Sequence, residues 1–486
     1  MDKREEIFDA LHEECGVFGC SVPERQNVAI LAYYALYALQ HRGQQSAGIA
    51  VNDDGVITAH CDEGLVNEVF DEASLAKVGS GCMAVGHVRY GTTGYEKRIN
   101  CQPLVVNHRK GSMAIAHNGN LTNDAELREE LELAGSIFHT TSDTEVIAYT
   151  ITKERLTTSS IEDAVSKAMD RIKGAYSLVI MSPKKLIGAR DPNGFRPLCI
   201  GRLPDGGYCF ASETCALDSI GARFERDVEP GEIVVISNGE LESRREHCNT
   251  AKPGFCVFEY IYFARPDSVI DGCSVHLARQ RAGEFLWEQR PVEADVVIGV
   301  PDSGLDAALG YSKASSIPYG IGFIKNKYIG RTFIQANQSD REKGVRIKLN
   351  PVSSTVHGKR VVLVDDSIVR GTTIKRIIRL LREAGATEVH VRLASPKFLF
   401  PCFFGTDVPS SENLIACKFD DEGLVRELGV DTIEFLSIEN AKRLTGDGPD
   451  GRGFDRFCTG CFSGEYPCEP PKSKWVNKFM NKLTKN

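Results

Sequence analysis

Residues 360–373, RVVLVDDSIVRGTT, decide the fold class of the second half of the chain. An apolar, β-branched run ends in two acids, Asp365 and Asp366, and a small-residue loop leads into a predicted helix at residues 374–383. Backbone N–H groups at residues 369–373 would face a phosphate at the N-terminus of that helix, while the acids can hold ribose hydroxyls or a magnesium ion. The alternative is a buried strand whose acids only cap the helix, which leaves the second acid and the Gly-Thr-Thr sequence unexplained.

The pattern around this segment, from about residue 250 onward, consists of buried β-branched runs separated by helices. Such alternation predicts an α/β domain with a parallel, doubly wound sheet. The predicted strands are residues 295–300, 319–324, 360–364 and 388–393.

The 360–373 segment resembles the phosphoribosylpyrophosphate (PRPP) signature of type I phosphoribosyltransferases. GVPDSG at residues 299–304 resembles the loop with which that family holds pyrophosphate, although alone it is also compatible with a simple turn. The resemblance implies one Mg²⁺ per subunit, held by Ser303, Asp365 and Asp366. The PRPP-binding residues that it implies are Asp302, Ser303, Gly304, Asp365, Asp366, Ser367, Arg370, Gly371, Thr372 and Thr373.

Residues 325–350 are polar and basic, with only a weak apolar pattern. By the same resemblance they form a lid, including Lys325 and Tyr328, that closes over PRPP. A closed lid would exclude water from the reactive anomeric carbon. The alternative is a solvated, charged linker.

The first half of the chain has a different pattern, in which short strands form hairpins and alternate with helices. Residues 49–61 turn at Asp-Asp-Gly and residues 232–243 turn at Asn-Gly, both typical of tight antiparallel connections. Residues 113–117 and 176–181 are further predicted strands. We therefore expect antiparallel sheet with packed helices in this half.

Five motifs occur in order along this half. A lone cysteine such as Cys15 in CGVFG is usually structural, but the ordered set resembles the glutaminase domain of class II amidotransferases, which are N-terminal-nucleophile hydrolases. The resemblance implies an α+β fold of the αββα sandwich type. The other four motifs are HRGQQSAG at 41–48, GHVRYGTTG at 86–94, HNGNLTN at 117–123 and TSDTE at 141–145.

The residue types in these motifs fit amide hydrolysis. A thiolate must attack the carboxamide, and the base nearest to a cysteine at a chain terminus is its own α-amino group, whose pKa is about 8. Cys15 should therefore become the first residue, and residues 1–14 would be a propeptide that is removed.

The amidotransferase resemblance also assigns the groups around the nucleophile. The Asn118 side chain and the Gly119 N–H would form the oxyanion hole, a contribution of about 3 to 4 kcal/mol. Arg89 and Asp143 would hold the α-carboxylate and α-amino group of glutamine, and Arg42, the third member of this glutamine-binding set, would order the pocket. Alternatively, Arg89 and Asp143 form ordinary ion pairs.

Sixteen cysteines are many for a chain in a reducing compartment and suggest metal or catalytic use of some of them. CTGC at residues 458–461 alone is compatible with zinc, redox or no special role. Two more cysteines, Cys256 and Cys402, have flanks that resemble one branch of the amidotransferases, which implies one [4Fe-4S] cluster on Cys256, Cys402, Cys458 and Cys461. Zn²⁺ is the alternative for this four-cysteine site, and Cys468 is the residue most easily confused with a ligand.

Length and composition are those of an ordinary globular protein. The 486 residues allow two or three domains, and a net charge of −8 disfavours a nucleic-acid binder. The longest apolar run, residues 28–39, is too short to cross a bilayer and predicts a buried helix instead. Residues 1–14 contain no apolar signal segment, so we expect a cytoplasmic protein with no membrane partner.

Together, the two halves resemble the glutamine PRPP amidotransferase family, in its cluster-containing, propeptide-bearing type. The resemblance implies that ammonia from glutamine is channelled to PRPP, giving 5-phosphoribosylamine, pyrophosphate and glutamate, the first committed step of de novo purine (IMP) biosynthesis. It also implies feedback by purine nucleotides and a homotetramer. The expected organisation is a propeptide (1–14), a glutamine amidotransferase domain (15–250), a phosphoribosyltransferase domain with the cluster ligands (251–470) and a basic tail (471–486), either a surface helix or disordered.

Two other functions are compatible with parts of the sequence. A PRPP-sensing regulator would reuse the phosphoribosyltransferase fold for binding only, but the net charge and the complete glutaminase set oppose it. The second is a glutaminase whose acceptor is not PRPP.

Overall fold

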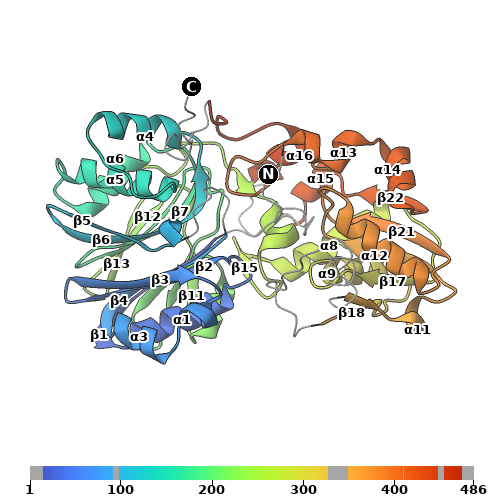
Figure 1. Cartoon of the computed structure of the whole chain (residues 1–486), viewed down its shortest axis with the longest axis horizontal. Coiled ribbons are helices and arrows are strands. Elements are labelled where there is room, and N and C mark those ends of the chain that lie inside the picture. Colours follow the sequence, from blue (N-terminus) through green and yellow to red (C-terminus); the bar gives the residue numbers. More distant parts are fainter. Residues whose placement is uncertain (1–14, 91–97, 327–348, 409, 447–453, 473–486) are drawn as a thin grey trace, which may run out of the picture.

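The computed structural model describes residues 15–90, 98–326, 349–408, 410–446 and 454–472. The first half is a four-layer sandwich in which two antiparallel sheets lie between helices (Figure 1). The prediction of an αββα sandwich is therefore confirmed. One sheet has the strand order β11-β9-β10-β1-β4-β2-β3 and the other β13-β12-β8-β7-β6-β5.

The strands of this half are short and are joined mostly by tight turns. The seven-stranded sheet comprises β1 (Gly16–Gln26), β2 (Ser46–Asp53), β3 (Val56–Glu63), β4 (Gly81–Arg89), β9 (Cys199–Arg202), β10 (Tyr208–Ala211) and β11 (Arg223–Asp227). The six-stranded sheet comprises β5 (Leu104–His108), β6 (Gly111–Leu121), β7 (Gly174–Met181), β8 (Leu186–Arg190), β12 (Ile233–Ser237) and β13 (Glu240–Arg244).

Both predicted hairpins are present. β2 pairs with β3 around Asp54 and Gly55, and β12 pairs with β13 around Asn238 and Gly239. All four turn residues have positive φ, between 49° and 91°. This backbone conformation matches the twist of a two-residue hairpin and favours Asn, Asp and Gly.

Helices cover the outer face of each sheet. α1 (Val28–Ala38), α2 (Val66–Val69), α3 (Glu72–Val78) and α7 (Thr214–Ser219) belong to the seven-stranded side; α4 (Asp124–Leu133), α5 (Asp143–Arg155) and α6 (Ile161–Met169) cover the six-stranded side (Figure 1). The apolar run at 28–39 forms α1 as predicted, but only one face of it is buried, since Tyr34 and Tyr37 are about half exposed, at 51% and 53%. Small and β-branched side chains, including Val17, Val85 and Val179, fill the space between the sheets.

The second half contains the predicted parallel sheet, with strand order β17-β20-β21-β22. Val297 and Val362 face a cluster that includes α8 and α9, while Ile298 and Leu363 face α12 and α14, so helices cover both faces. The bounds are β17 (Val296–Gly299), β20 (Arg360–Asp365), β21 (Glu388–Leu393) and β22 (Thr432–Phe435), with α8 (Val275–Gln289), α9 (Leu305–Ser315), α12 (Thr372–Glu383), α14 (Asp421–Leu428) and α15 (Ile438–Lys442).

The prediction that residues 319–324 form a buried strand of this sheet is wrong. Only Tyr319 bridges Val297 in parallel, and β18 (Phe323–Lys325) instead pairs antiparallel with β19 (Leu349–Pro351). Ile321 is exposed, and a Cβ on Gly322 would lie 2.4 Å from the Ile298 side chain. The segment thus passes too close to β17 to contribute a row of side chains, although its β-branched residues suggest a strand.

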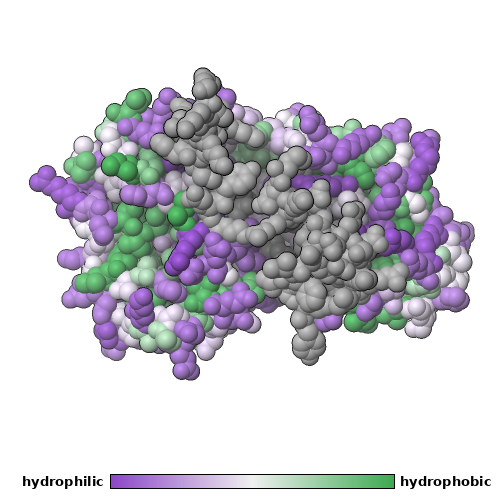
Figure 2. Space-filling view, viewed as in Figure 1, coloured by the Kyte–Doolittle hydropathy of each residue, from purple (hydrophilic) through white to green (hydrophobic). Residues whose placement is uncertain are grey.

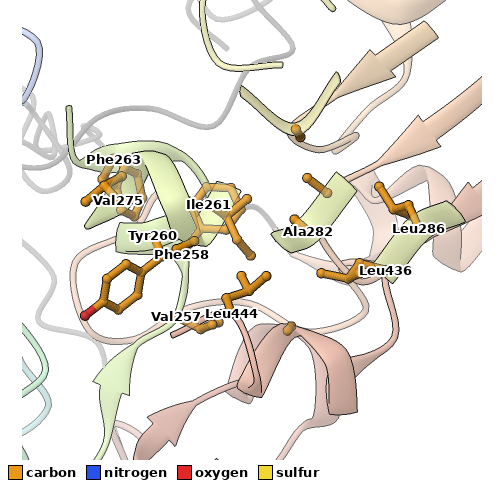
Figure 3. Packing of buried hydrophobic residues seen from close by; sticks show 14 of the residues in the cluster. Val257, Phe258, Tyr260, Ile261, Phe263, Val275, Ala282, Leu286, Leu436 and Leu444 are labelled. Atoms are coloured by element: carbon orange, nitrogen blue, oxygen red, sulfur yellow. The ribbon is translucent and has the colours of Figure 1, made fainter. Parts of the chain in front are cut away.

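A short π-helix, η2 (Glu259–Phe263), lies in the largest apolar cluster of the second half. Phe258 and Ile261 pack in this cluster with Ala282 and Leu286 of α8 and with Leu444 (Figure 3). Just before η2, β14 (Phe255–Cys256) pairs in parallel with β23 (Phe457–Cys458), which is followed by the short helix α16 (Gly460–Ser463). The segment around residues 457–463 is thereby fixed to the segment that joins the two halves.

None of the described helices is long and apolar enough to cross a bilayer. On the face shown in Figure 2, hydrophilic residues are interspersed with hydrophobic ones over both halves of the described chain.

Candidate active sites

Cys15 lies immediately before β1, where the strand meets the end of β4. Gly16 pairs with Val88, and the half-buried Cys15 thiol donates a weak hydrogen bond to the Tyr90 carbonyl at 3.7 Å. The Cys15 carbonyl accepts a hydrogen bond from Arg42 Nε at 3.2 Å. The predicted nucleophile is thus held by its backbone at the point where β1 meets the end of β4.

Asn118 and Gly119, the predicted oxyanion-hole residues, follow each other in β6. The Asn118 Nδ2 is buried and has no hydrogen-bond partner in the described part of the chain, so it is a donor without an acceptor. Gly119 has φ +142°, and a Cβ there would lie 2.1 Å from the Ala175 carbonyl oxygen, so only glycine fits. An unpaired buried donor is what a developing oxyanion requires.

His87 connects this strand to the nucleophile's sheet. Its Nε2 lies 3.0 Å from the His117 carbonyl oxygen, and His87 itself pairs with Val17 across β4 and β1. Burial lowers the pKa of His87 to about 3, so the ring is neutral and Nε2 donates. The strand that carries Asn118 is therefore fixed beside the start of β1.

Asp143 begins α5 and is buried beside His117. Its carboxylate accepts from the Leu121 N–H at 3.0 Å and lies 3.6 Å from His117 Nδ1. Burial alone would raise the pKa of this carboxyl, but His117, the Leu121 N–H and the nearby charge of Arg89 outweigh it and lower the pKa. An ionised acid close to a buried arginine is suited to bind an α-amino acid headgroup, as predicted for Asp143 and Arg89.

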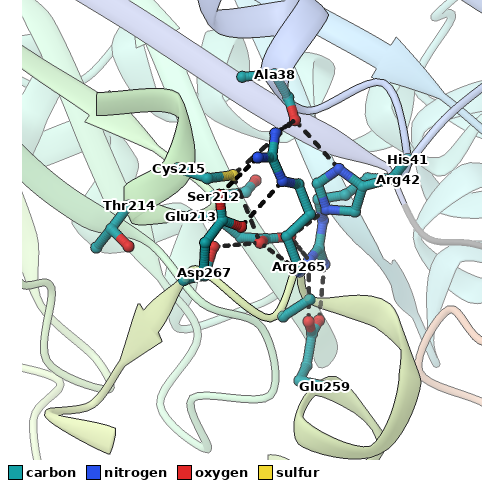
Figure 4. A network of polar contacts seen from close by, with 12 residues as sticks. Ala38, His41, Arg42, Ser212, Glu213, Thr214, Cys215, Glu259, Arg265 and Asp267 are labelled. Carbon is teal, nitrogen blue, oxygen red and sulfur yellow. Dashed lines mark hydrogen bonds and ion pairs between the residues drawn. The ribbon is translucent and has the colours of Figure 1, made fainter. Parts of the chain in front are cut away.

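Arg42 is buried and lies against carboxylates of both halves. Its guanidinium donates to Glu213 at 2.6 Å and to both oxygens of Glu259 at 2.7 and 2.9 Å (Figure 4). These contacts, together with the one to the Cys15 carbonyl, agree with the predicted role of Arg42 in ordering the pocket. The Nε, Nη1 and Nη2 atoms of Arg42 thus each donate to a group of the protein itself.

The acid pair of the second site lies at the carboxyl edge of the parallel sheet. Asp365 ends β20 and Asp366 follows, and both are buried. Ser303 and Ser367 each donate a hydrogen bond to Asp366, and the Asp366 N–H donates to Asp365 Oδ1 at 2.9 Å. The structure thus brings together the three groups predicted to bind magnesium, Ser303, Asp365 and Asp366.

Burial and mutual repulsion dominate the electrostatics of this pair. Burial and the neighbouring Asp366 charge raise the pKa of Asp365 well above its usual value. Burial also raises the pKa of Asp366, against the opposing hydrogen bonds from Ser303 and Ser367. Two carboxylates and a hydroxyl are oxygen donors of the type that Mg²⁺ prefers, with water and phosphate oxygens completing its shell.

The two predicted phosphate-binding loops flank the acids. Gly304 caps α9 and follows Asp302, whose carboxylate pairs with Lys325 at the start of the predicted lid. On the other side Gly371 caps α12 with φ +86°, and a Cβ there would meet the Ile415 side chain at 2.3 Å. Arg370 lies in the loop between β20 and α12, and Thr372 and Thr373 are the first residues of α12, so this helix begins at the edge that holds the acids.

The four predicted cluster cysteines line one enclosed cavity. Cys256 and Cys458 face each other in the β14–β23 pair, and the Cys461 carbonyl accepts from the backbone N–H groups of residues 399 and 400, just before Cys402. Burial raises the pKa of Cys458 to about 12. Cys468 does not line the cavity; its sulfur lies 3.8 Å from Thr122 Oγ1.

Several predicted features lie outside the described residues. They are the propeptide (1–14), the end of the third glutaminase motif (91–94), Tyr328 with most of the predicted lid (327–348) and most of the basic tail (473–486).

Comparison with known proteins agrees with this two-site geometry. Residues 91–219 match the glutamine amidotransferase domain family and residues 276–394 match the phosphoribosyl transferase domain family. The amidophosphoribosyltransferase of Bacillus subtilis is 49% identical over 460 residues (94% of this chain, 95% of the relative), and that of Methanocaldococcus jannaschii is 47% identical over 469 residues (94% and 98%). The chain belongs to the amidophosphoribosyltransferase family.

Solved structures agree with this membership. The B. subtilis glutamine PRPP amidotransferase complexed with ADP and GMP superposes with a TM-score of 0.86 at 49% identity (94% of this chain, 98% of that chain). A structure described as the allosteric regulatory enzyme of purine biosynthesis gives 0.89 at 47% identity (97% and 100%). The function is therefore the amidophosphoribosyltransferase reaction, which transfers the amide nitrogen of glutamine to PRPP. Of the three functions considered from the sequence, the PRPP-sensing regulator and the glutaminase with another acceptor are not supported.

An amidophosphoribosyltransferase must connect two reactions, and the residues at that connection were missed from the sequence. Glu213, Glu259 and Arg196 are fully buried between the halves. The sequence contains one signal for this cluster, the single acid Glu259 within the apolar run FCVFEYIYFA. An acid is rarely buried without a charged partner, so its position in an apolar run indicates a buried ion pair.

Proposed function

We propose that the two described sites divide the amidophosphoribosyltransferase reaction between them. Cys15, Asn118, Gly119, Arg89 and Asp143 release ammonia from glutamine. The Ser303, Asp365 and Asp366 site, with the loops at residues 302–304 and 367–373, binds PRPP and directs its amination. The observation that carries this division is the unpartnered Asn118 amide on one side and the buried acid pair on the other. Its test is the joint release of glutamate and pyrophosphate by processed enzyme given glutamine, magnesium and PRPP.

The glutamine reaction uses the thiol and the oxyanion hole. The Cys15 sulfur attacks the side-chain carbonyl carbon, and the oxygen becomes negatively charged while the Asn118 Nδ2–H and the Gly119 N–H stabilise it. The carbon–nitrogen bond then breaks, the leaving nitrogen takes a proton as ammonia, and a γ-glutamyl thioester remains. Water hydrolyses that thioester to glutamate and the free thiol.

The second reaction joins the ammonia nitrogen to C1 of PRPP. The nitrogen lone pair forms the new bond as the bond from C1 to the pyrophosphate oxygen breaks. Ammonia is channelled between the sites, because in bulk water it would be protonated and would lose its nucleophilic lone pair. Magnesium, held by Ser303, Asp365 and Asp366, would offset the charge on the leaving pyrophosphate.

The four-cysteine cavity supports a [4Fe-4S] cluster over Zn²⁺. Four thiolates around one zinc ion at about 2.3 Å would bring their sulfurs within about 4 Å of each other. Among the described residues, however, no three Cys, His, Asp or Glu side chains lie close enough to share one metal ion, whereas a cluster spreads its ligands over four irons. The reaction transfers no electrons, so the group is structural and fixes the C-terminal segment to the rest of the chain.

We expect protein purified without oxygen to be brown and to contain about four irons per chain. Cys461→Ser should lower the iron content and the visible absorbance, because this sulfur lines the cavity. Cys468→Ser, a nearby thiol outside the cavity, serves as the matched control and should retain both. Colourless wild-type protein with one zinc per chain would contradict the cluster.

Processing at Cys15 supplies the terminal amine that the mechanism requires. Residues 1–14 are removed, so that the α-amino group of Cys15 serves as the base for its own thiol. The intact mass of the active protein should therefore lack residues 1–14. A fully active species that retains them would contradict the terminal-amine mechanism.

Purine nucleotides are the proposed feedback inhibitors. The support is that the similar B. subtilis enzyme was solved with ADP and GMP. A homotetramer in the cytoplasm is the proposed working form.

A further inference from the structure

One carboxylate of the second half is buried against the glutamine site. Glu259 is fully buried at the start of η2, and its neighbours Phe258, Tyr260 and Ile261 pack in an apolar cluster (Figure 3). A charge in such surroundings is costly unless it is paired and hydrogen-bonded. The partners of Glu259 therefore indicate what it holds in place.

The first partner is Arg42, which Glu259 binds with both carboxylate oxygens. Arg42 Nη1 and Nη2 donate to Glu259 at 2.9 and 2.7 Å (Figure 4). Arg42 Nε donates to the Cys15 carbonyl at 3.2 Å. A two-point contact fixes the plane of the guanidinium as well as its position. Glu259 thereby determines where Arg42 holds the backbone of the nucleophile.

The second partner is Arg196, which contacts a segment that packs against Gly119 of the proposed oxyanion hole. Arg196 Nη1 lies 3.4 Å from Glu259, and its Nη2 donates to the Phe404 carbonyl at 2.7 Å. The next residue, Gly405, packs on the predicted oxyanion glycine, since a Cβ there would lie 3.4 Å from the carbonyl carbon of Gly119. Arg42 thus contacts the backbone of Cys15 directly, and Arg196 contacts the segment that packs against Gly119.

The charges in this interface are balanced. Glu213 and Glu259 oppose Arg42 and Arg196, and all four side chains are fully buried. Glu213 is additionally bound by His41 at 2.8 Å and Ser268 at 2.6 Å, so it has alternative partners. Glu259 is the carboxylate that contacts both arginines, and its removal would leave two buried positive charges facing one acid.

We propose that Glu259 is a positioning residue for glutamine hydrolysis. It holds the Cys15 carbonyl through Arg42 and the Gly119 backbone through Arg196 and residues 404–406. The proposal rests on the roles of Cys15 and Gly119 given under Proposed function. Attack on the amide requires the sulfur and the oxyanion donors in fixed mutual positions, and a displacement of about 1 Å can cost about 100-fold in rate. A carboxylate from the second half thus completes the geometry of the first.

The test compares Glu259→Gln with wild type, both as the processed enzyme that begins at Cys15 and carries its metal content as purified. The turnover number for glutamine hydrolysis should fall about 100-fold, while the glutamine KM changes by less than about threefold, because Arg89 and Asp143 are not displaced. Pyrophosphate release with added ammonia in place of glutamine should stay within about twofold of wild type, since it does not use the glutamine site. The rate at which iodoacetamide alkylates Cys15 should also differ from the wild-type rate, because the backbone of Cys15 is held differently.

Glu232→Gln is the matched control. Glu232 is equally buried and binds Arg226 at 2.7 and 2.8 Å, but this pair lies within the first half, away from Cys15. Both activities of this variant should remain near wild type. Glu259→Asp, which retains the charge, should recover part of the lost turnover.

Two results would overturn the proposal. One is a Glu259→Gln enzyme with wild-type glutamine turnover; the other is an equal loss of glutamine-dependent and ammonia-dependent activity, which would indicate a purely structural pair. If Glu259→Gln does not fold, Arg196→Lys tests the second contact with the same two assays and the same expected split. Failure of the Cys15 mechanism itself would instead be seen as retained glutamine hydrolysis in Cys15→Ala.

Discussion

Cys15→Ala is expected to abolish glutamine-dependent synthesis of phosphoribosylamine while ammonia-dependent synthesis continues. Without the sulfur no thioester forms, and the loss of a catalytic nucleophile lowers the turnover number by about 10⁴-fold or more. The proposed PRPP site is built from β17, β20 and their loops and does not contain Cys15. Added ammonia at alkaline pH therefore bypasses the lesion. The measurement is pyrophosphate release with each nitrogen donor in turn.

A second cysteine provides the control for this experiment. Cys248 is also a part-buried thiol of the first half, but it lies after β13, where its N–H donates to the Arg245 carbonyl at 3.1 Å. Cys248→Ala should keep both activities. Equal loss of the two activities in Cys15→Ala, or retained glutamine hydrolysis, would contradict the assignment of the nucleophile.

Asp365→Asn is expected to have the opposite effect, with loss of phosphoribosylamine formation from either nitrogen donor and retention of basal glutamine hydrolysis. The substitution removes one of the two carboxylates at the proposed magnesium site. Since metal stabilisation of a leaving group contributes several kcal/mol, the rate should fall about 1,000-fold or more. Loss of both activities would contradict the division of labour between the sites.

The same variant should not be less stable than wild type. Asp365 is buried beside Asp366, and burial with this repulsion raises its pKa well above the usual value. Asparagine has nearly the same shape, removes the repulsion and still offers Oδ1 to the Asp366 N–H. In thermal unfolding without magnesium, the midpoint of Asp365→Asn should equal or exceed that of wild type, so an inactive variant would not be an unfolded one.

The parts of the fold that local sequence determines were predictable. The Asn-Gly hairpin at residues 238–239 and the acids after β20 depend on turn conformation and on the end of one strand, which neighbouring residues define. Residues 319–324 were predicted wrongly for the same reason. Their β-branched residues suggest a strand, whereas the close approach of Gly322 to Ile298 is visible only in three dimensions.

The same distinction applies to the sites: residues in local motifs were predicted, and contacts between distant segments were not. Cys15 and Asn118 stand in motifs whose residue types fit the chemistry, and the structure places their strands beside each other through His87. The four cluster cysteines were assigned only through resemblance, because they are far apart in the sequence and meet only in the fold. The contacts of Glu259 with Arg42 and Arg196 carry no sequence signal beyond an acid in an apolar run, since each joins segments more than 60 residues apart.

The most direct test of the account measures glutamate and pyrophosphate together, from processed wild-type enzyme with glutamine and magnesium, with and without PRPP. We expect joint release that PRPP stimulates, and we expect the Asp365→Asn enzyme to release glutamate at the basal rate and no pyrophosphate. Glutamate release that is independent of PRPP, without pyrophosphate from the wild-type enzyme, would contradict the coupling of the two sites.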